Sequence, residues 1–191
     1  MNLEDLRDTK PADNVDLVGN ADQETWYYDV SNPSFACNLI NRCYGYLDWR
    51  PTYYVCTDKY VLDNYHDDVQ ESIAVCKYAF LPSEEGRFTG DNIIPIIVKG
   101  EDTGDLPATE GMYGHGTTLF IALQIAQLIG FEQVTFRNCD LYFGKNLHFY
   151  GDDVMAKWSQ EELSRRRLRS IQAHFWMIVF ADKNKMRLRY L

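Results

Sequence analysis

The chain lacks any apolar run long enough to span a membrane, and its first residues, MNLEDLRDTK, are acidic and polar, unlike a signal peptide. It also has few basic residues relative to acidic ones: 19 Lys and Arg residues against 28 Asp and Glu residues give a net charge of −9. Since binding to phosphate backbones depends on basic side chains, this balance argues against a nucleic-acid-coated protein. The one exception is the run RRRLR at 165–169. These absences predict a soluble, cytoplasmic protein with no membrane span.

Motifs for disulfides, structural zinc and P-loop chemistry are missing as well. Five cysteines form no CxxC pair and their number is odd, which favours reduced structural thiols. No Gly-rich loop ends in a Lys-Ser or Lys-Thr pair, so ATPase chemistry of the P-loop kind is not expected. We find no Asp-x-Asp motif at a strand end, and GDD at 151–153 is typical of a solvated turn. The sequence therefore predicts no metal site.

Strand-like and helix-like patterns alternate along the 191 residues, of which 46% are apolar. Strands are predicted at 14–20, 34–40, 51–58, 72–80, 92–100, 133–140 and 186–191, and helices at 61–72, 117–129 and from the capping-box pattern at 159–162 onward. Pro95 predicts that the fifth strand is an edge strand or irregular. This alternation predicts a single α/β domain over 1–191, with a Rossmann-like, doubly wound, mainly parallel sheet and helices on both faces.

Two segments have more than one interpretation. Residues 81–113 are rich in Gly, Pro, Asp, Glu and Thr and form either a lid or a solvated surface excursion. The last helix carries four apolar residues on or near one face: Leu163, Ile171, Phe175 and Ile178. Its basic run either forms a solvated face with Glu161–Arg165 and Glu162–Arg166 pairs or engages a phosphorylated or acidic acceptor.

Polar residues follow the predicted strands, where ligands bind in open parallel sheets. Gly19 and Asn20 end the first strand, in a turn that exposes backbone amides. Asn38 ends the second strand, and Asp58, after the third, either accepts a bond from a ribose hydroxyl or caps the next helix. We expect these side chains to share one crevice.

The predicted helix at 117–129 begins with small and hydroxyl residues, Gly116, Thr117 and Thr118, next to His115. A helix N-terminus binds anions through its free N–H groups, although N-capping alone also explains a threonine. Asp140 and Tyr142 follow the strand at 133–140, and His148 lies a few residues further on. Because imidazole titrates near neutrality, His148 is the candidate general base.

A family resemblance rests on six segments in order: LVGNAD, ACNLINR, RPTYYVCTD, GTTLFIALQIAQLIGF, NCDLYF and HFYGDD. Over roughly 14–150 the chain resembles the bacterial lipooligosaccharide sialyltransferases, whose wider relatives include flagellar motility-accessory glycosyltransferases and archaeal hydroxymethylpterin pyrophosphokinases. The resemblance implies that Asn20 and Asn38 contact the nucleotide, that the turn at 116–118 lies beside its phosphate, and that His148 is the catalytic base.

The resemblance further implies that Asp140 and Tyr142 lie at the reaction centre, with the phenol supporting the departing phosphate. The chain departs from the sialyltransferase pattern at one place. Those enzymes carry a long lid between the Asp-x-Tyr segment and the catalytic His, whereas only 143–147 intervene here. A second lid tyrosine is therefore missing unless Tyr113 or Tyr150 replaces it.

The expected function is a metal-independent glycosyltransferase that takes a sugar from a nucleotide-sugar donor, its only co-substrate, and transfers it to a hydroxyl acceptor. The acceptor is a glycan, a lipid-linked glycan or, less readily, a modified nucleic acid. Two alternatives stay open: a pyrophosphokinase using ATP and Mg²⁺ held by Asp140 or Asp153, and a nucleotide-binding protein without turnover.

Overall fold

The computed structural model describes residues 1–21, 32–99, 111–114, 116–139, 148–149 and 159–191. Its main sheet has seven strands in the order β5-β4-β3-β2-β1-β8-β9, and every neighbouring pair is parallel. The strands are β1 (Asn14–Val18), β2 (Ser34–Cys37), β3 (Tyr53–Val55), β4 (Tyr78–Pro82), β5 (Ile93–Ile96), β8 (Gln133–Arg137) and β9 (Arg187–Tyr190). The predicted α/β fold with a parallel sheet is therefore confirmed.

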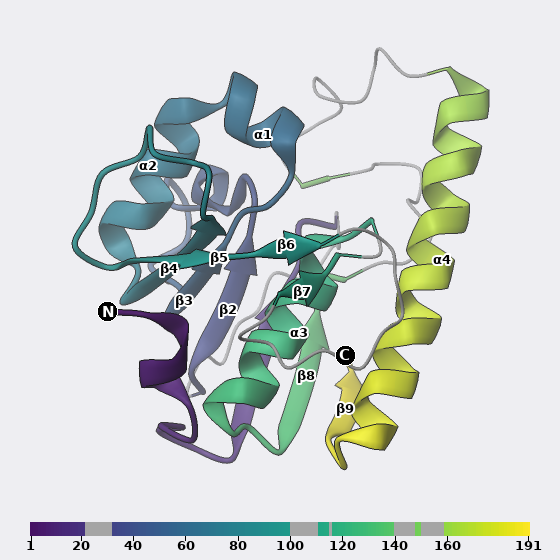
Figure 1. The fold of residues 1–191 in the computed structure, drawn as a ribbon. Coiled ribbons are helices and arrows are strands. Elements are labelled where there is room, and N and C mark those ends of the chain that lie inside the picture. Colours follow the sequence, from purple (N-terminus) through teal and green to yellow (C-terminus); the bar gives the residue numbers. More distant parts are fainter. Residues whose placement is uncertain (22–31, 100–110, 115, 140–147, 150–158) are drawn as a thin grey trace.

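Helices cover both faces of this sheet, which makes it Rossmann-like and doubly wound (Figure 1). One face packs against α3 (Thr118–Ile129), α4 (Gln160–Lys183) and the short 3-10 helix η1 (Leu3–Leu6). The other face packs against α1 (Lys59–Asn64), α2 (His66–Val75) and η2 (Ile40–Cys43). Two separate hydrophobic clusters result, one on each side of the sheet.

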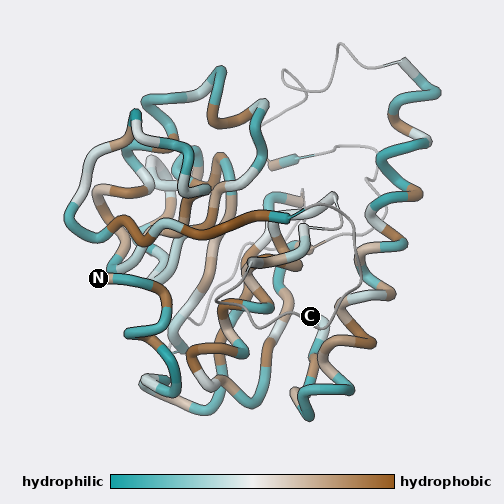
Figure 2. Tube along the Cα trace, in the orientation of Figure 1, coloured by the Kyte–Doolittle hydropathy of each residue, from teal (hydrophilic) through white to brown (hydrophobic). Residues whose placement is uncertain are grey.

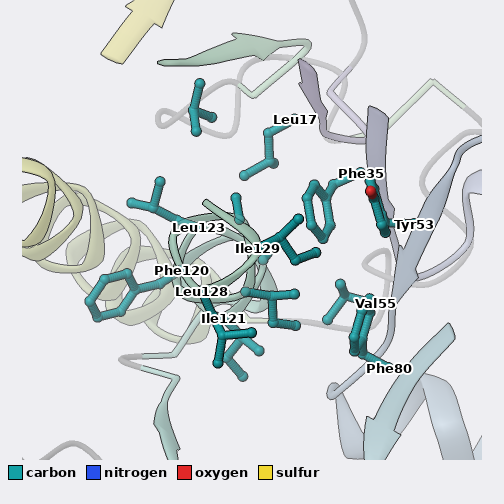
Figure 3. Packing of buried hydrophobic residues seen from close by; sticks show 14 of the residues in the cluster. Leu17, Phe35, Tyr53, Val55, Phe80, Phe120, Ile121, Leu123, Leu128 and Ile129 are labelled. Carbon is teal, nitrogen blue, oxygen red and sulfur yellow. The ribbon is translucent and has the colours of Figure 1, made fainter. Parts of the chain in front are cut away.

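Helix α3 is the centre of the first cluster. Ten of its twelve residues are buried, and most of its length has hydrophobic colours in Figure 2. Side chains of β1, β2 and β3, among them Leu17, Phe35 and Tyr53, pack against its Ile129 side (Figure 3). The helix ends at Gly130, whose φ of 99° is the left-handed conformation of a glycine C-cap. This burial fixes where the N-terminus of α3 lies.

The predicted boundary between the helix at 61–72 and the strand at 72–80 is wrong. The structure has two helices, α1 and α2, and residues 72–75 are the last turn of α2 rather than the start of a strand. The buried residues Val69, Ser72 and Ile73 follow helical spacing, and the Ser72 hydroxyl bonds the Asp68 carbonyl one turn earlier. Strand β4 begins only at Tyr78.

The described part of 81–113 contains strands. Strand β5 lies at the edge of the main sheet, as Pro95 predicts. The chain then forms β6 (Val98–Lys99), which pairs with β7 (Met112–Tyr113) in a separate two-stranded sheet. Gln124 of α3 holds β7 in place, because its amide both accepts from the Tyr113 N–H and donates to the Tyr113 carbonyl. Residues 100–110 lie outside the described residues.

No helix among the described residues has the length and apolar character needed to cross a membrane.

The described strands contain one buried ion pair, between β1 and β8. Arg137 Nε donates to Asp16 Oδ2 at 2.9 Å, and Asp16 is 1% exposed. Because a buried charge depends on its partner, this pair ties the two central strands together.

We expect Asp16→Ala to lower the free energy of unfolding by about 3 kcal/mol, because it leaves the largely buried Arg137 guanidinium without its carboxylate. The matched control is Glu132→Ala, which removes an exposed ion pair with Lys10 and should cost less than about 1 kcal/mol. Urea unfolding followed by circular dichroism measures both. Equal losses for the two variants would contradict the role assigned to Asp16.

Candidate functional site

The strand order reverses between β1 and β8. From β1 the chain proceeds through β2 to β5 on one side, and β8 and β9 lie on the other side. At such a switch point the connections leave in opposite directions, so the carboxyl ends of the two strands border a crevice where ligands bind in α/β proteins. The residues that follow β1 and β8 therefore border the expected ligand crevice.

Gly19 brings the end of β1 against the end of β8. Its N–H donates to the Arg137 carbonyl at 2.9 Å, and the Ala21 N–H donates to the Asn138 carbonyl at 3.0 Å. A Cβ on Gly19 would lie 2.4 Å from the Asn138 carbonyl oxygen and 3.0 Å from Cys139 Sγ. No larger residue fits here without displacing one of the strands. The two carboxyl ends are thus held in direct contact.

Asn20 connects three segments at this edge. Its Nδ2 donates to the Cys37 carbonyl at the end of β2, at 3.1 Å. Its carbonyl oxygen accepts from the Phe149 N–H, also at 3.1 Å. Its Oδ1 is buried and has no hydrogen-bond partner among the described residues. A buried acceptor without a partner is costly, and such an atom is a natural contact for a ligand.

Asn38 connects the end of β2 to β3 and α3. It has a φ of 55°, and the Tyr54 hydroxyl donates to its carbonyl oxygen at 2.7 Å. The Thr118 hydroxyl donates to its Oδ1 at 3.4 Å and lies 3.1 Å from the Thr57 hydroxyl. Residues from three elements, Asn38, Thr57 and Thr118, therefore meet at the same edge of the sheet.

Asp58 and Thr117 are helix caps. The Asp58 carboxylate accepts from the Tyr60 N–H at 2.9 Å and starts α1, and the Thr117 hydroxyl accepts from the Leu119 N–H at 3.3 Å and starts α3. Capping is one of the two interpretations that the sequence allows for each residue. Their side chains are already engaged in the fold, whereas Asn20 Oδ1 is not.

Gly116 brings α4 close to the start of α3. Its φ is 78°, and a Cβ there would lie 3.6 Å from the side chain of Arg169. The aliphatic part of a basic side chain therefore lies beside the turn that leads into α3, whose N-terminus favours anions. The sequence singles out the basic run that contains Arg169. Its contact with Gly116 could not be predicted, because the two residues lie far apart in the sequence. His115 lies outside the described residues.

His148 lies beside the end of β1, because the N–H of its neighbour Phe149 binds the Asn20 carbonyl. The imidazole is half-buried and its Nδ1 is out of contact with solvent. Phe149 packs edge-on against Tyr46, with ring centroids 6.4 Å apart, which fixes the segment against the second cluster. Asp140 and Tyr142 lie outside the described residues.

The described residues contain no group of three His, Cys, Asp or Glu side chains arranged to hold a metal ion. Of the neighbouring pair Asp67 and Asp68, the second accepts from Asn41 and pairs with Arg42 at 3.1 Å. These contacts give the Asp68 carboxylate a structural role between η2 and α2.

A hollow of about 560 Å³ lies at the opposite edge of the sheet. The start of β3 and the N-terminal segment line it, and its polar residues include Asp5, Thr9, Asn32, Thr52 and Lys77. None of the predicted site residues that the structure describes lines this hollow. The carboxyl edge is therefore the better candidate site.

No protein-family model matches the chain, and a search of curated proteins found no significant match.

None of the five cysteines forms a disulfide bond in the structure. Burial raises the pKa of Cys37 well above its usual value, that of Cys43 to about 11, and those of Cys56 and Cys76 to about 12. Cys139 alone is half-buried; it lies at the carboxyl end of β8, and its thiol contacts the Arg137 carbonyl at 3.2 Å. Cys139 is therefore the most accessible of the five thiols, and it lies at the candidate site.

Thiol labelling should report on this site. Because the thiolate is the reactive form, the four buried cysteines with raised pKa values stay protonated and unreactive at about pH 8. We expect a maleimide to modify Cys139 first and the others only on unfolding, as measured by mass spectrometry. Cys139→Ser should abolish the early labelling. Early labelling of Cys56 or Cys76 would contradict this description of the core.

Substitution of Gly19 tests the contact between β1 and β8. We expect Gly19→Ala to destabilise the protein by about 1–3 kcal/mol, because the methyl group overlaps the Asn138 carbonyl. Gly45→Ala is the control, since a Cβ there meets nothing within 4 Å. Thermal unfolding measures both, and a neutral Gly19→Ala would rule out the tight approach of the two strands.

Proposed function

We propose that the chain is a metal-independent glycosyltransferase that binds a nucleotide-sugar at the carboxyl ends of β1, β2 and β8 and uses His148 as its general base. The observation that carries the proposal is the hydrogen bond from the Phe149 N–H to the Asn20 carbonyl. It holds a histidine against the strand end at the switch point, where α/β folds bind their ligands.

The nucleotide is the ligand whose chemistry suits the groups at this edge. Asn20 Oδ1 is a buried acceptor that needs a donor, which the amino group of a base or a ribose hydroxyl supplies. The N-terminus of α3 and the neighbouring Arg169 favour an anion such as the donor's phosphate. Asn38 and Thr118, which are hydrogen-bonded to each other at the same edge, are assigned to align the donor.

The reaction proposed is a direct displacement at the anomeric carbon. His148 takes the proton of the acceptor hydroxyl as its oxygen forms a bond to that carbon, and the bond from the carbon to the nucleotide phosphate oxygen breaks. Tyr142 and Asp140 are assigned to the departing phosphate by the family resemblance alone. The net charge of −9 favours a glycan or lipid-linked glycan over a nucleic acid as acceptor.

Replacement of His148 tests the proposal. A panel of CMP-, UDP- and GDP-sugars in EDTA is assayed for donor hydrolysis and for transfer to simple glycans. We expect turnover of one donor class by the native chain and a loss of about a hundredfold to ten-thousandfold in His148→Ala, the usual contribution of a positioned base. His66→Ala, an exposed histidine stacked on Phe88, should keep full activity.

Nucleotide binding separates the possible outcomes. Thermal shift should rise with the same nucleotide for the native chain and for His148→Ala, and fall away for Asn20→Ala, because ligand binding adds stability by mass action. Activity that requires ATP and Mg²⁺ would replace the proposal with pyrophosphoryl transfer. Binding without turnover, unchanged by His148→Ala, would leave a nucleotide-binding protein.

A further inference from the structure

Helix α4 presents an apolar face to solvent. Its buried face consists of Ala173, Met177 and Ala181. Four larger apolar residues lie on the outer face with exposed fractions of 48–58%: Leu168, Ile171, Phe175 and Ile178. The sequence places three of these on or near one helix face, and that face is turned away from the core. A continuous exposed apolar stripe of this kind marks an interaction surface.

The spacing of these residues is that of a coiled-coil seam. They follow one another at intervals of three, four and three residues, the a and d positions of a heptad. The same repeat continues outward to polar residues, with Glu161 and Ser164 before the stripe and Asp182 after it, and Lys185 follows in the turn just beyond the end of the helix. We call these eight positions the α4 seam.

We propose that the α4 seam pairs antiparallel with the α4 seam of a second copy of this chain. In an antiparallel pair, a positions face d positions, so a twofold axis near residue 173 sets Leu168 against Ile178 and Ile171 against Phe175 of the second copy. Each contact occurs twice by symmetry, which gives four apolar layers in the centre.

The charged residues at the ends of the stripe favour the antiparallel pair over a parallel pair or a shifted register. At each end of the four apolar layers, this register places Asp182 of the second copy opposite Ser164, whose hydroxyl donates to the Gln160 carbonyl within its own helix. It also brings Glu161 near Lys185 in the turn after α4 of the second copy, where the two can form an ion pair. A parallel pair would instead set Asp182 against Asp182 and Lys185 against Lys185. A shift of one heptad would set Phe175 against Ser164. Only the proposed register matches apolar with apolar and acid with base.

The end residues are available for these contacts. Within the part of the chain that the structure describes, Glu161, Asp182 and Lys185 make no ion pair, whereas their neighbour Glu162 pairs with both Arg165 and Arg166. Of the two pairs that the sequence suggests for this helix, Glu162–Arg166 forms, and Arg165 turns to Glu162 instead of Glu161. Glu161 is thus left for a second copy.

The position of α4 allows the approach. The helix stands at one side of the molecule beside β9, the last strand of the sheet (Figure 1). Its inner side packs on α3, where Phe180 meets Phe120 edge-on at 5.7 Å, so the seam remains outside. A helix of 24 residues is about 36 Å long, and four apolar layers on it suit a modest interface with a Kd of about 1 µM.

The test is the association state of the intact chain by analytical ultracentrifugation over a range of concentrations. We expect a monomer–dimer equilibrium that Phe175→Glu weakens about a hundredfold, because two buried aromatic contacts are lost. Ile97→Glu is the matched control: Ile97 is 50% exposed, lies outside α4, and its replacement should leave the equilibrium unchanged.

A charge exchange tests the register. Glu161→Lys and Lys185→Glu each set like charges against each other and should weaken the dimer by about tenfold, whereas the double variant should restore it. Circular dichroism confirms that each variant is folded. A monomer at every concentration, a dimer that tolerates Phe175→Glu, or a double variant no better than the single ones would each overturn the proposal.

Discussion

The contact between the end of β1 and the end of β8 is the constraint on which the rest of the site depends. Gly19 has no space for a side chain, because the Asn138 carbonyl oxygen occupies the position of its Cβ. The following residue, Asn20, is therefore held between β2 and the 148–149 segment. Within the part of the chain that the structure describes, its buried Oδ1 has no hydrogen-bond partner, which is a cost that a bound ligand removes.

The two faces of the sheet contribute differently to that edge. The face covered by α3 supplies a deeply buried helix whose first turn is fixed by Thr118 against Asn38 and Thr57. The other face holds Phe149 among residues of the second cluster, and so positions its neighbour His148. Rigid elements on both sides thus place polar groups at one edge, the arrangement that a preorganised site requires.

Much of the fold follows from local pattern. The alternation of strand and helix patterns predicts the parallel sheet, and Pro95 predicts that β5 lies at its edge. The C-terminal boundary of α2 does not follow from local sequence. Ser72 and Ile73 fit the pattern of a strand or of a helix, and only their burial in the fold shows which one forms. The roles of Asp58 and Thr117 are ambiguous for the same reason: a strand-end carboxylate or hydroxyl serves a cap and a ligand equally well.

A crystal structure of the chain with the nucleotide that stabilises it tests the central claim most directly. The account predicts a nucleotide at the carboxyl ends of β1 and β2, with a donor group within hydrogen-bond distance of Asn20 Oδ1 and the sugar facing His148. A nucleotide in the hollow at the opposite edge, beside Lys77 and Thr52, would contradict it.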